Sequence, residues 1–305
     1  MMAADPAGLP GQRTRIVAFG DIVNDIVAVP RAAVRRDTDT ISTIRPRPGG
    51  SAANTAAWLG SLGSPVDFVG CVGIADLDYH VQQLRAQGVV PHLSTAPGLP
   101  TSTIVILVEG EHRTMLTERG ANRALRAADV TDELLAQAAV LHLTGYALMD
   151  GPRQAGMRDL IDRAHAAGAV VSLNPGSAGF IADFGPAEFV SAVEGVDIVI
   201  ANVHETALLC DETDPERITR VMADRYGLAV ITQGPESVFV AERGSKPVSV
   251  PVPQVRSIDP TGAGDAMSAG FLNSWVMDRE PVRAAQAGIL VAARAVMVIG
   301  GRPVI

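Results

Sequence analysis

A glycine-rich turn, Gly262-Ala263-Gly264-Asp265, carries the residue types best suited to chemistry in this chain. Small and apolar residues follow it at helical spacing, which predicts a tight turn that opens a buried helix. The first N–H groups of a helix lack acceptors and face its positive pole, so the amides of Ala263, Gly264 and Asp265 could bind a phosphate oxygen. The Asp265 carboxylate on the same rim could remove the proton from a hydroxyl that attacks phosphorus. For an isolated G-x-G-D, a plain turn with an Asp near a helix start is the ordinary alternative.

The longer run at residues 259–271 resembles the carboxyl-terminal signature of the ribokinase-like, or PfkB, carbohydrate kinases. In that family the Asp of the G-A-G-D element is the catalytic base, and the preceding amides form an anion hole. The resemblance therefore assigns the base to Asp265 and the anion hole to Gly262, Ala263 and Gly264. It implies a ribokinase-like three-layer α/β/α fold with a mainly parallel central sheet and a small β-sheet lid.

Length and composition favour one large domain with a small appendage. The chain has 305 residues, of which 47% are hydrophobic, and this is ample for a sizeable core. We expect residues 1–14 to form a flexible amino-terminal segment and residues 15–305 to form the kinase domain. No apolar run is long enough to span a bilayer, and residues 1–12 lack the basic and apolar regions of a signal peptide, so we expect a cytoplasmic protein.

The charged and sulfur-containing residues exclude several functional classes. The only lysine, Lys246, lies in Gly-Ser-Lys-Pro, so the chain has neither a G-x-x-x-x-G-K-[ST] phosphate loop nor the strand lysine of a protein kinase. The formal net charge of −8 argues against a general nucleic-acid surface. Cys71 and Cys210 each lie in an apolar segment without a C-x-x-C motif, so we expect buried thiols.

An aspartate near the amino terminus is a candidate for binding sugar hydroxyls. The apolar run 15–19 predicts a buried first strand that enters Gly20, and Asp21 and Asp25 follow it. A carboxylate just past such a strand faces the crevice where open α/β sheets bind ligands, although capping of its own turn explains it equally well. In the family, a substrate-binding Asp stands at the spacing of Asp25 from Gly20, so the resemblance assigns Asp25 to the acceptor.

The run Gly-Gly-Ser-Ala-Ala-Asn at residues 49–54 precedes a helix of small residues that ends at Gly63. We expect Ser51 to be the N-cap of this helix and the glycine pair to allow a ligand to approach the backbone. Asn54 offers donors and an acceptor on the first turn, which suits two adjacent hydroxyls. The run resembles the family's G-G-x-x-x-N element, which implies that Gly50 and Asn54 contact the substrate.

Two stretches, residues 40–45 and 103–117, mix β-branched with polar residues and predict strands with one wet face. The second contains a turn at residues 109–111. These strands are either edge strands of the main sheet or a separate small sheet. In the family, strands from these places form a lid over the sugar, which favours lid strands within about residues 26–46 and 100–118. Such lids often pair between subunits in the family, so the resemblance is compatible with a homodimer through the lid.

The rest of the chain alternates strands and helices, which predicts a parallel sheet covered on both faces. The predicted strands are residues 140–143, 170–173, 197–201 and 228–232, and the predicted helices are residues 152–167, 215–226 and 281–298.

Asn202 and Glu205 lie three residues apart at a predicted helix start and therefore share one face. Their hard oxygen atoms suit Mg²⁺ that is held through water and phosphate. A capping box, in which Asn202 caps the helix and Glu205 reaches back to its N–H, fits the same spacing. The family's N-x-x-E element coincides with this position and is associated with Mg²⁺ and phosphate, so the resemblance favours the metal role for Glu205 and a nucleotide role for Asn202.

Four further residues are candidates through the resemblance alone. Thr232 and Gly234 match the T-x-G element of the family's nucleotide site, and Asn174 closes a predicted strand beside it. Asp259 stands where some relatives bind a monovalent cation such as K⁺.

Together these residues predict an ATP-dependent kinase that phosphorylates a hydroxyl of a small sugar or sugar-like compound. Val23 and Gly145 stand where ribokinases proper carry Asn and Glu, which disfavours ribose itself. A nucleoside kinase of the same fold is the main alternative. A nucleotide-binding oxidoreductase would need G-x-G-x-x-G, but the last position is Met267. A sugar-binding protein without catalysis would not need Asp265.

Overall fold

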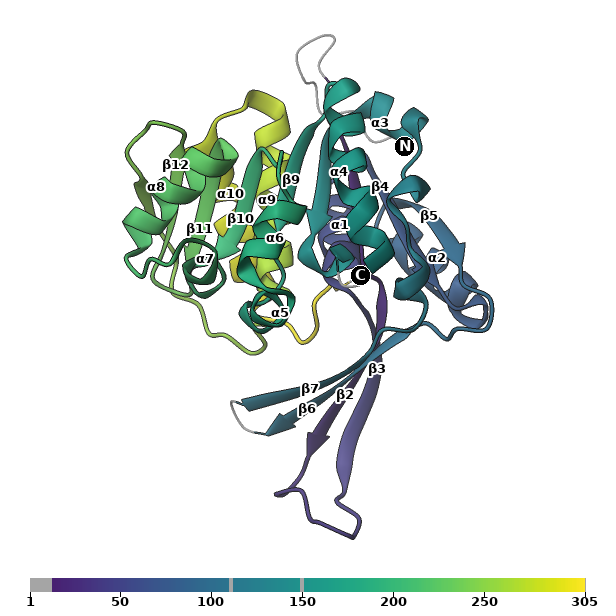
Figure 1. Ribbon diagram of the computed structural model, residues 1–305. Coiled ribbons are helices and arrows are strands. Elements are labelled where there is room, and N and C mark those ends of the chain that lie inside the picture. Colours follow the sequence, from purple (N-terminus) through teal and green to yellow (C-terminus); the bar gives the residue numbers. More distant parts are fainter. Residues whose placement is uncertain (1–12, 110–111, 149–150, 305) are drawn as a thin grey trace, which may run out of the picture.

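The computed structural model describes residues 13–109, 112–148 and 151–304. Most of the predicted flexible segment, residues 1–12, and the predicted turn at residues 110–111 lie outside the described residues. Figure 1 shows a large body of helices and strands from which a small sheet projects. No helix within the described ranges is long and apolar enough to cross a membrane.

A nine-stranded sheet runs through the body of the described chain, and β1 is one of its inner strands. In spatial order its strands are β13 (Val248–Pro251), β12 (Ser237–Glu242), β11 (Leu228–Gln233), β10 (Ile198–Asn202), β9 (Val170–Asn174), β8 (Ala138–Thr144), β1 (Arg15–Phe19), β4 (Val66–Val72) and β5 (Val89–Thr95). All neighbours pair in parallel except β11 with β12 and β12 with β13. The predicted mainly parallel sheet is therefore confirmed.

Helices cover both faces of this sheet, and each face has its own hydrophobic core. One face carries α1 (Ser51–Ser61), α2 (Leu77–Ala86), α9 (Ala263–Asp278) and α10 (Pro281–Ala295). The other carries α3 (Asp132–Gln137), α4 (Gly151–Ala166), α5 (Ala178–Phe184), α6 (Pro186–Ala192), α7 (Val203–Cys210) and α8 (Pro215–Tyr226). Short 3₁₀ turns are η1 (Ile74–Asp76), η2 (Gly120–Ala124), η3 (Ala127–Asp129) and η4 (Gly145–Leu148). In β1, Val17 and Phe19 enter one core and Ile16 and Ala18 the other, so the strand is apolar from its second residue to its last.

The small sheet contains four strands and is separate from the large one. Its order is β3 (Ser42–Gly49), β2 (Val23–Pro30), β6 (Ser102–Glu109) and β7 (His112–Glu118). Strands β2 and β6 are parallel, and the two outer pairs are antiparallel. The alternative that these strands are edge strands of the main sheet is therefore wrong, and the predicted fold class with its small sheet is confirmed (Figure 1).

Helix α9 is held from several sides. Its residues Ala266, Ala269 and Phe271 are fully buried. Gly270 lies where α10 crosses it, and a Cβ added there would come within 2.8 Å of the Gly288 Cα. Because the two helices approach this closely, their positions are fixed relative to each other.

Candidate active site

Two cavities adjoin where the strands of the large sheet end at their carboxyl termini. The first has a volume of about 680 Å³ and extends toward the small sheet, and the second has a volume of about 720 Å³. Four residues line both cavities: Ser51, Tyr146, Gly262 and Asp265. The predicted turn is therefore open on both sides, and Asp265 lies at the boundary between two spaces that can each hold a ligand.

The polar floor of the first cavity contains the three predicted substrate residues. Asp25 comes from β2, Gly50 precedes α1 and Asn54 lies on the first turns of α1. Gly50 has φ 98°, and a Cβ there would come within 2.5 Å of the Asp21 carbonyl oxygen, so only glycine fits. The pKa of Asp25 is raised to about 7, mainly by burial. The positive charge of Arg302 opposes this rise, and the negative charge of Asp21 adds to it.

Asp21 has a role that the sequence analysis did not assign. Its carboxylate accepts hydrogen bonds from the Ser51 N–H (2.8 Å), the Ala52 N–H (3.2 Å) and the Thr144 hydroxyl (3.1 Å). The prediction that Ser51 is the N-cap of α1 is wrong, because Gly50 is the N-cap and the aspartate supplies the acceptor for the first amides. The Ser51 hydroxyl is thereby free for another partner.

That partner is Asp265. The Ser51 hydroxyl donates to Asp265 Oδ1 at 2.7 Å, and Asn54 Nδ2 donates to Asp265 Oδ2 at 3.0 Å. The pKa of Asp265 is raised to about 7, mainly by burial. The two hydrogen bonds oppose this rise, and the nearby carboxylates of Asp21 and Asp25 add to it. The result is an oriented carboxylate that titrates near neutral pH.

The turn before α9 leaves two amides for an anion. Gly262 is the N-cap with φ 75°, a left-handed conformation that favours glycine. The Ala263 N–H already donates to the Pro260 carbonyl oxygen at 3.2 Å, so one of the three predicted anion-binding amides is used within the turn. The N–H groups of Gly264 and Asp265 belong to the first helical turn and have no acceptor within the helix. These two point to an anion site at the helix start.

The second cavity is lined by every residue predicted for the nucleotide and its metal ion. These are Asn174 from the end of β9, Asn202 from the end of β10, Glu205 from α7, Thr232 from β11 and Gly234 just beyond it. A Cβ added to Gly264 would meet its nearest described neighbour, Asn174 Nδ2, only at 3.6 Å. The second cavity therefore reaches the anion site of the turn without obstruction.

Glu205 and Asn202 form the capping box that the sequence left as an alternative to the metal role. Asn202 Oδ1 accepts from the Glu205 N–H at 2.9 Å, and Glu205 Oε2 accepts from the Asn202 N–H at 2.9 Å. Burial raises the pKa of Glu205 to about 7, against the lowering effect of the hydrogen bonds that its carboxylate accepts from the backbone and side chain of Asn202. The Glu205 carboxylate accepts two bonds, one from the N–H and one from Nδ2 of Asn202, and it keeps free lone pairs, so Glu205 also fits the role of one ligand to Mg²⁺. The described residues include no group of three or more His, Cys, Asp or Glu that could hold a metal alone.

The Asp259 carboxylate accepts hydrogen bonds and an ion pair from groups of the protein itself. Oδ1 accepts from the Thr261 N–H at 2.9 Å and pairs with Arg113 Nη2 of β7 at 3.0 Å, and Oδ2 accepts from the Gly300 N–H at 2.9 Å. Asp259 lines neither cavity. The Arg113 guanidinium therefore already neutralises the carboxylate that the resemblance assigned to a monovalent cation.

An apolar and aromatic wall faces the polar floor of the first cavity. It consists of Ile104, Ile106, Met115, Tyr146, Phe180 and Phe184. The ring centroids of Tyr146 and Phe180 are 5.4 Å apart, and those of Phe180 and Phe184 are 5.6 Å apart. No motif indicated this wall, because its members come from β6, β7, η4 and α5, which are distant in sequence.

Comparison with known proteins identifies the family of the chain. Residues 13–304 match the model of the pfkB family carbohydrate kinases. A fructokinase from Rhizobium leguminosarum bv. trifolii is 31% identical over 242 residues, which cover 76% of this chain and 73% of that protein. An ATP-dependent ribose-1-phosphate kinase from Halopiger xanaduensis is 26% identical over 274 residues and 88% of each chain. The crystal structure of an adenosine kinase from Sinorhizobium meliloti superposes with a TM-score of 0.85, at 28% identity, over 96% of this chain and 97% of that one. The chain belongs to the pfkB family of carbohydrate kinases, the family that its two glycine-rich motifs resemble.

Proposed function

We propose that this sugar or nucleoside kinase transfers the γ-phosphoryl group of ATP to a hydroxyl of a small sugar or sugar-like compound, with Asp265 as general base. One observation carries the proposal: the Asp265 carboxylate is on the wall that the two cavities share. A phosphoryl acceptor in one cavity and a nucleotide in the other would meet at this residue.

The acceptor would bind in the first cavity. The Asp25 carboxylate and the Asn54 side chain would hold its hydroxyls, and Asp265 would take the proton from the hydroxyl that attacks. Ser51 and Asn54 already orient the Asp265 carboxylate, so little reorganisation is needed when the substrate binds. A pKa of about 7 is well matched to proton removal at neutral pH.

ATP would bind in the second cavity with its phosphates toward the turn. The N–H groups of Gly264 and Asp265 would stabilise the charge on the transferring phosphoryl group, and Asn174, Thr232 and Gly234 would line the rest of the nucleotide. Mg²⁺ near Glu205 would neutralise phosphate charge and be held mainly through water and phosphate oxygens.

The small sheet would act as a lid. Strands β6 and β7 supply Ile104, Ile106 and Met115 to the first cavity, so the sheet covers bound acceptor and excludes water from the reaction. The ion pair between Arg113 of β7 and Asp259, 3.0 Å long, links the lid to the loop that leads into the catalytic turn.

A nucleoside is a second candidate for the acceptor, and the aromatic wall favours it. A free sugar is polar on all sides, whereas a nucleoside joins a ribose to a flat base that can stack on aromatic rings. The polar floor at Asp25 and Asn54 would take the ribose, and the wall around Phe180 would take the base.

Phosphotransfer to a panel of sugars and nucleosides, measured as ADP release, tests the proposal and separates the two acceptor classes. In the same assay, Asp265→Asn should reduce kcat by roughly 10²- to 10⁴-fold, the usual contribution of a general base, while ATP binding and the melting temperature remain close to those of the wild type. Near-normal turnover in this variant would remove Asp265 from the role.

A further inference from the structure

The carboxyl-terminal segment after α10 is pinned against the active site. Trp58 Nε1 of α1 donates to the Gly301 carbonyl oxygen at 2.9 Å, and Gln87 Nε2 donates to the Pro303 carbonyl oxygen at 3.0 Å. A Cβ added to Gly301 would come within 2.4 Å of Asn54 Nδ2, so the backbone touches a predicted substrate residue. Arg302, which no motif singled out, lies between these anchors.

The Arg302 side chain is buried beneath the floor of the first cavity, with 8% of its surface exposed. Nε donates to Asn54 Oδ1 at 3.2 Å, and Nη2 donates to the Gly49 carbonyl oxygen at 2.9 Å. The guanidinium thus contacts the start of α1 at two points. Asn54 in turn donates to Asp265 at 3.0 Å, so the three side chains form a continuous hydrogen-bonded chain.

We propose that Arg302 is a positioning residue for catalysis, which fixes the Asn54 amide so that its NH₂ group faces the Asp265 carboxylate. The inference rests on the proposed function, because it assigns Arg302 a role through the general base.

The chemistry of an amide explains why one contact fixes the other. An asparagine side chain has an acceptor at one end and a donor at the other. An arginine can only donate, so its contact requires Oδ1 to point toward Arg302, and Nδ2 must then point toward Asp265. Without the guanidinium the amide could rotate and present its oxygen to the carboxylate, where two acceptors would repel each other. Arg302 therefore selects the one orientation of Asn54 that supports an ionised base.

The positive charge of Arg302 also favours the ionised form of Asp265. The titratable groups that interact with it come from separate elements: Asp21 after β1, Asp25 on β2, Tyr79 and His80 on α2, and Asp265 on α9. Three of these are carboxyl groups near one another in a buried site, and a buried positive charge favours their ionised forms. Removing it should raise the pKa of Asp265 through both the lost charge and the lost Asn54 hydrogen bond.

The test is Arg302→Met, which keeps the length of the side chain and removes its donors and charge. We expect kcat to fall by about 10- to 100-fold, as for the loss of a hydrogen bond to a charged group, and the KM for ATP to change little. The acidic limb of the pH profile of kcat should move to higher pH by about one unit. A role in packing alone would not move this limb. A folded Arg302→Met variant with normal kcat and an unmoved limb overturns the proposal.

A double-mutant cycle separates action through Asn54 from a direct effect of charge. In an Asn54→Ala background, Arg302→Met should have a much smaller effect on kcat than in the wild type, because the amide that it orients is absent. Fully additive effects would contradict the proposed chain.

If Arg302→Met does not fold, Arg302→Lys is the variant to test. Lysine keeps the charge but makes only one of the two contacts, so kcat should fall by less than in Arg302→Met. Wild-type kinetics in a folded Arg302→Lys variant would also count against the proposal.

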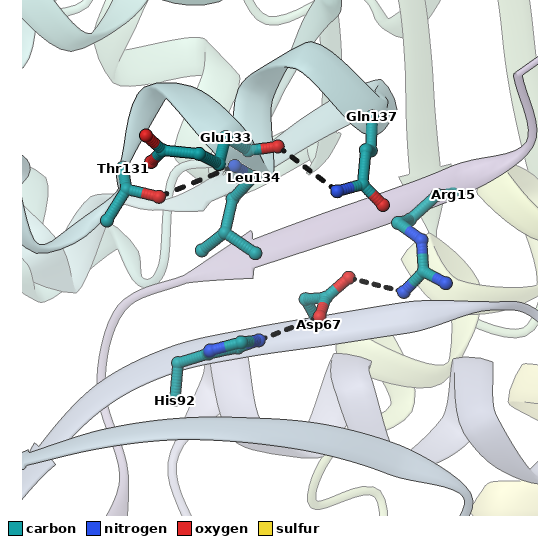
Figure 2. Close-up of polar contacts among 7 residues, drawn as sticks. All are labelled: Arg15, Asp67, His92, Thr131, Glu133, Leu134 and Gln137. Carbon is teal, nitrogen blue, oxygen red and sulfur yellow. Dashed lines mark hydrogen bonds and ion pairs between the residues drawn. The ribbon is translucent and has the colours of Figure 1, made fainter.

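Arg15→Met is the matched control. Arg15 begins β1 at the opposite end of the strand from the site, and its Nη1 pairs with Asp67 Oδ2 at 2.7 Å (Figure 2). This variant should lower the melting temperature without moving the acidic limb. If the wild type transfers no phosphate, or if Asp265→Asn keeps full activity, the proposed function fails first. If both behave as proposed and Arg302→Met is neutral, only the inference about Arg302 fails.

Discussion

Replacing Ser51 by Ala tests how the structure tunes the pKa of Asp265, the proposed general base. The Ser51 hydroxyl donates to Asp265 Oδ1 at 2.7 Å, and this bond opposes the burial that raises the pKa of Asp265 to about 7. The Ser51 N–H, which donates to Asp21, stays in place when the side chain is shortened. Alanine is also a good helix former at the start of α1. The substitution therefore removes one contact to the base and little else.

The size of the effect follows from the energy of that contact. A base with a pKa of about 7 makes kcat rise with pH and reach its plateau above neutrality, so that activity at pH 6 is about tenfold below the plateau. A hydrogen bond to a charged group contributes about 1.5–3 kcal/mol, and one pKa unit corresponds to about 1.4 kcal/mol. Because the lost bond favours the ionised carboxylate, Ser51→Ala should move the acidic limb upward by about 1–2 pH units.

The assay is kcat at saturating ATP and acceptor between pH 5 and 9, coupled to ADP release, for the wild type and the variant. The pKa values of Asp25 and Glu205 are also raised by burial to about 7, and they can steepen the limb. Their contribution is common to both proteins, so the difference between the two profiles reports Asp265. Ser61→Ala is the control, because Ser61 lies at the other end of α1 and its hydroxyl donates to the Trp58 carbonyl oxygen at 2.8 Å.

Two results would refute the reasoning. A wild-type limb near pH 4 would mean that burial does not raise the pKa of the base. A Ser51→Ala limb that coincides with that of the wild type would mean that the Ser51 hydroxyl does not stabilise the ionised carboxylate. Ser61→Ala should leave the limb where it is, and a shift in this control would point to a general effect on α1.

Asp25→Asn should abolish acceptor binding and yet raise the free energy of unfolding at pH 8 by about 1–3 kcal/mol. The reason is that the pKa of Asp25 is raised in the fold, so its ionisation destabilises the wild type as pH rises from about 4 to 7. At pH 4 thermal melting should show no gain, and an equal gain at both pH values would contradict this explanation. Arg113→Met should break the partly buried ion pair with Asp259 and raise the acceptor KM by about 3- to 10-fold with a smaller change in kcat. At constant ionic strength, wild-type activity should be equal in KCl and NaCl, and a requirement for K⁺ would show that Arg113 does not satisfy Asp259.

The turn from Gly262 to Asp265 could be predicted from the sequence because its geometry is local. A left-handed glycine, a helix start and an acidic residue are consecutive in the chain, and Gly262 and Asp265 are found in those roles in the fold. The strand ends that carry Asn174, Asn202 and Thr232 were also predictable, since parallel strands end at a common edge.

Other features depend on contacts between distant segments, and no local pattern encodes them. Ser51 matches the pattern of an N-cap, but Asp21 competes for the same amides and leaves the hydroxyl to Asp265. Arg302 meets Asn54 only because the chain end returns to α1. The mixture of β-branched and polar residues in the lid strands fits edge strands of the main sheet as well as a separate sheet. Only the pairing of β2 with β6 decides between these two arrangements.

The charge of the first cavity restricts the acceptor. The buried Asp21, Asp25 and Asp265 all line it. Its lining also includes one guanidinium, that of Arg119, and Arg302 beneath the floor is engaged with Asn54 and Gly49. An anionic acceptor would add a negative charge beside these buried carboxylates, where like charges repel strongly because water screens them little. A neutral, hydroxyl-rich compound instead offers donors to the same oxygen atoms. Under the proposed function, three buried carboxyl groups against one guanidinium in the lining favour neutral sugars and nucleosides over anionic acceptors.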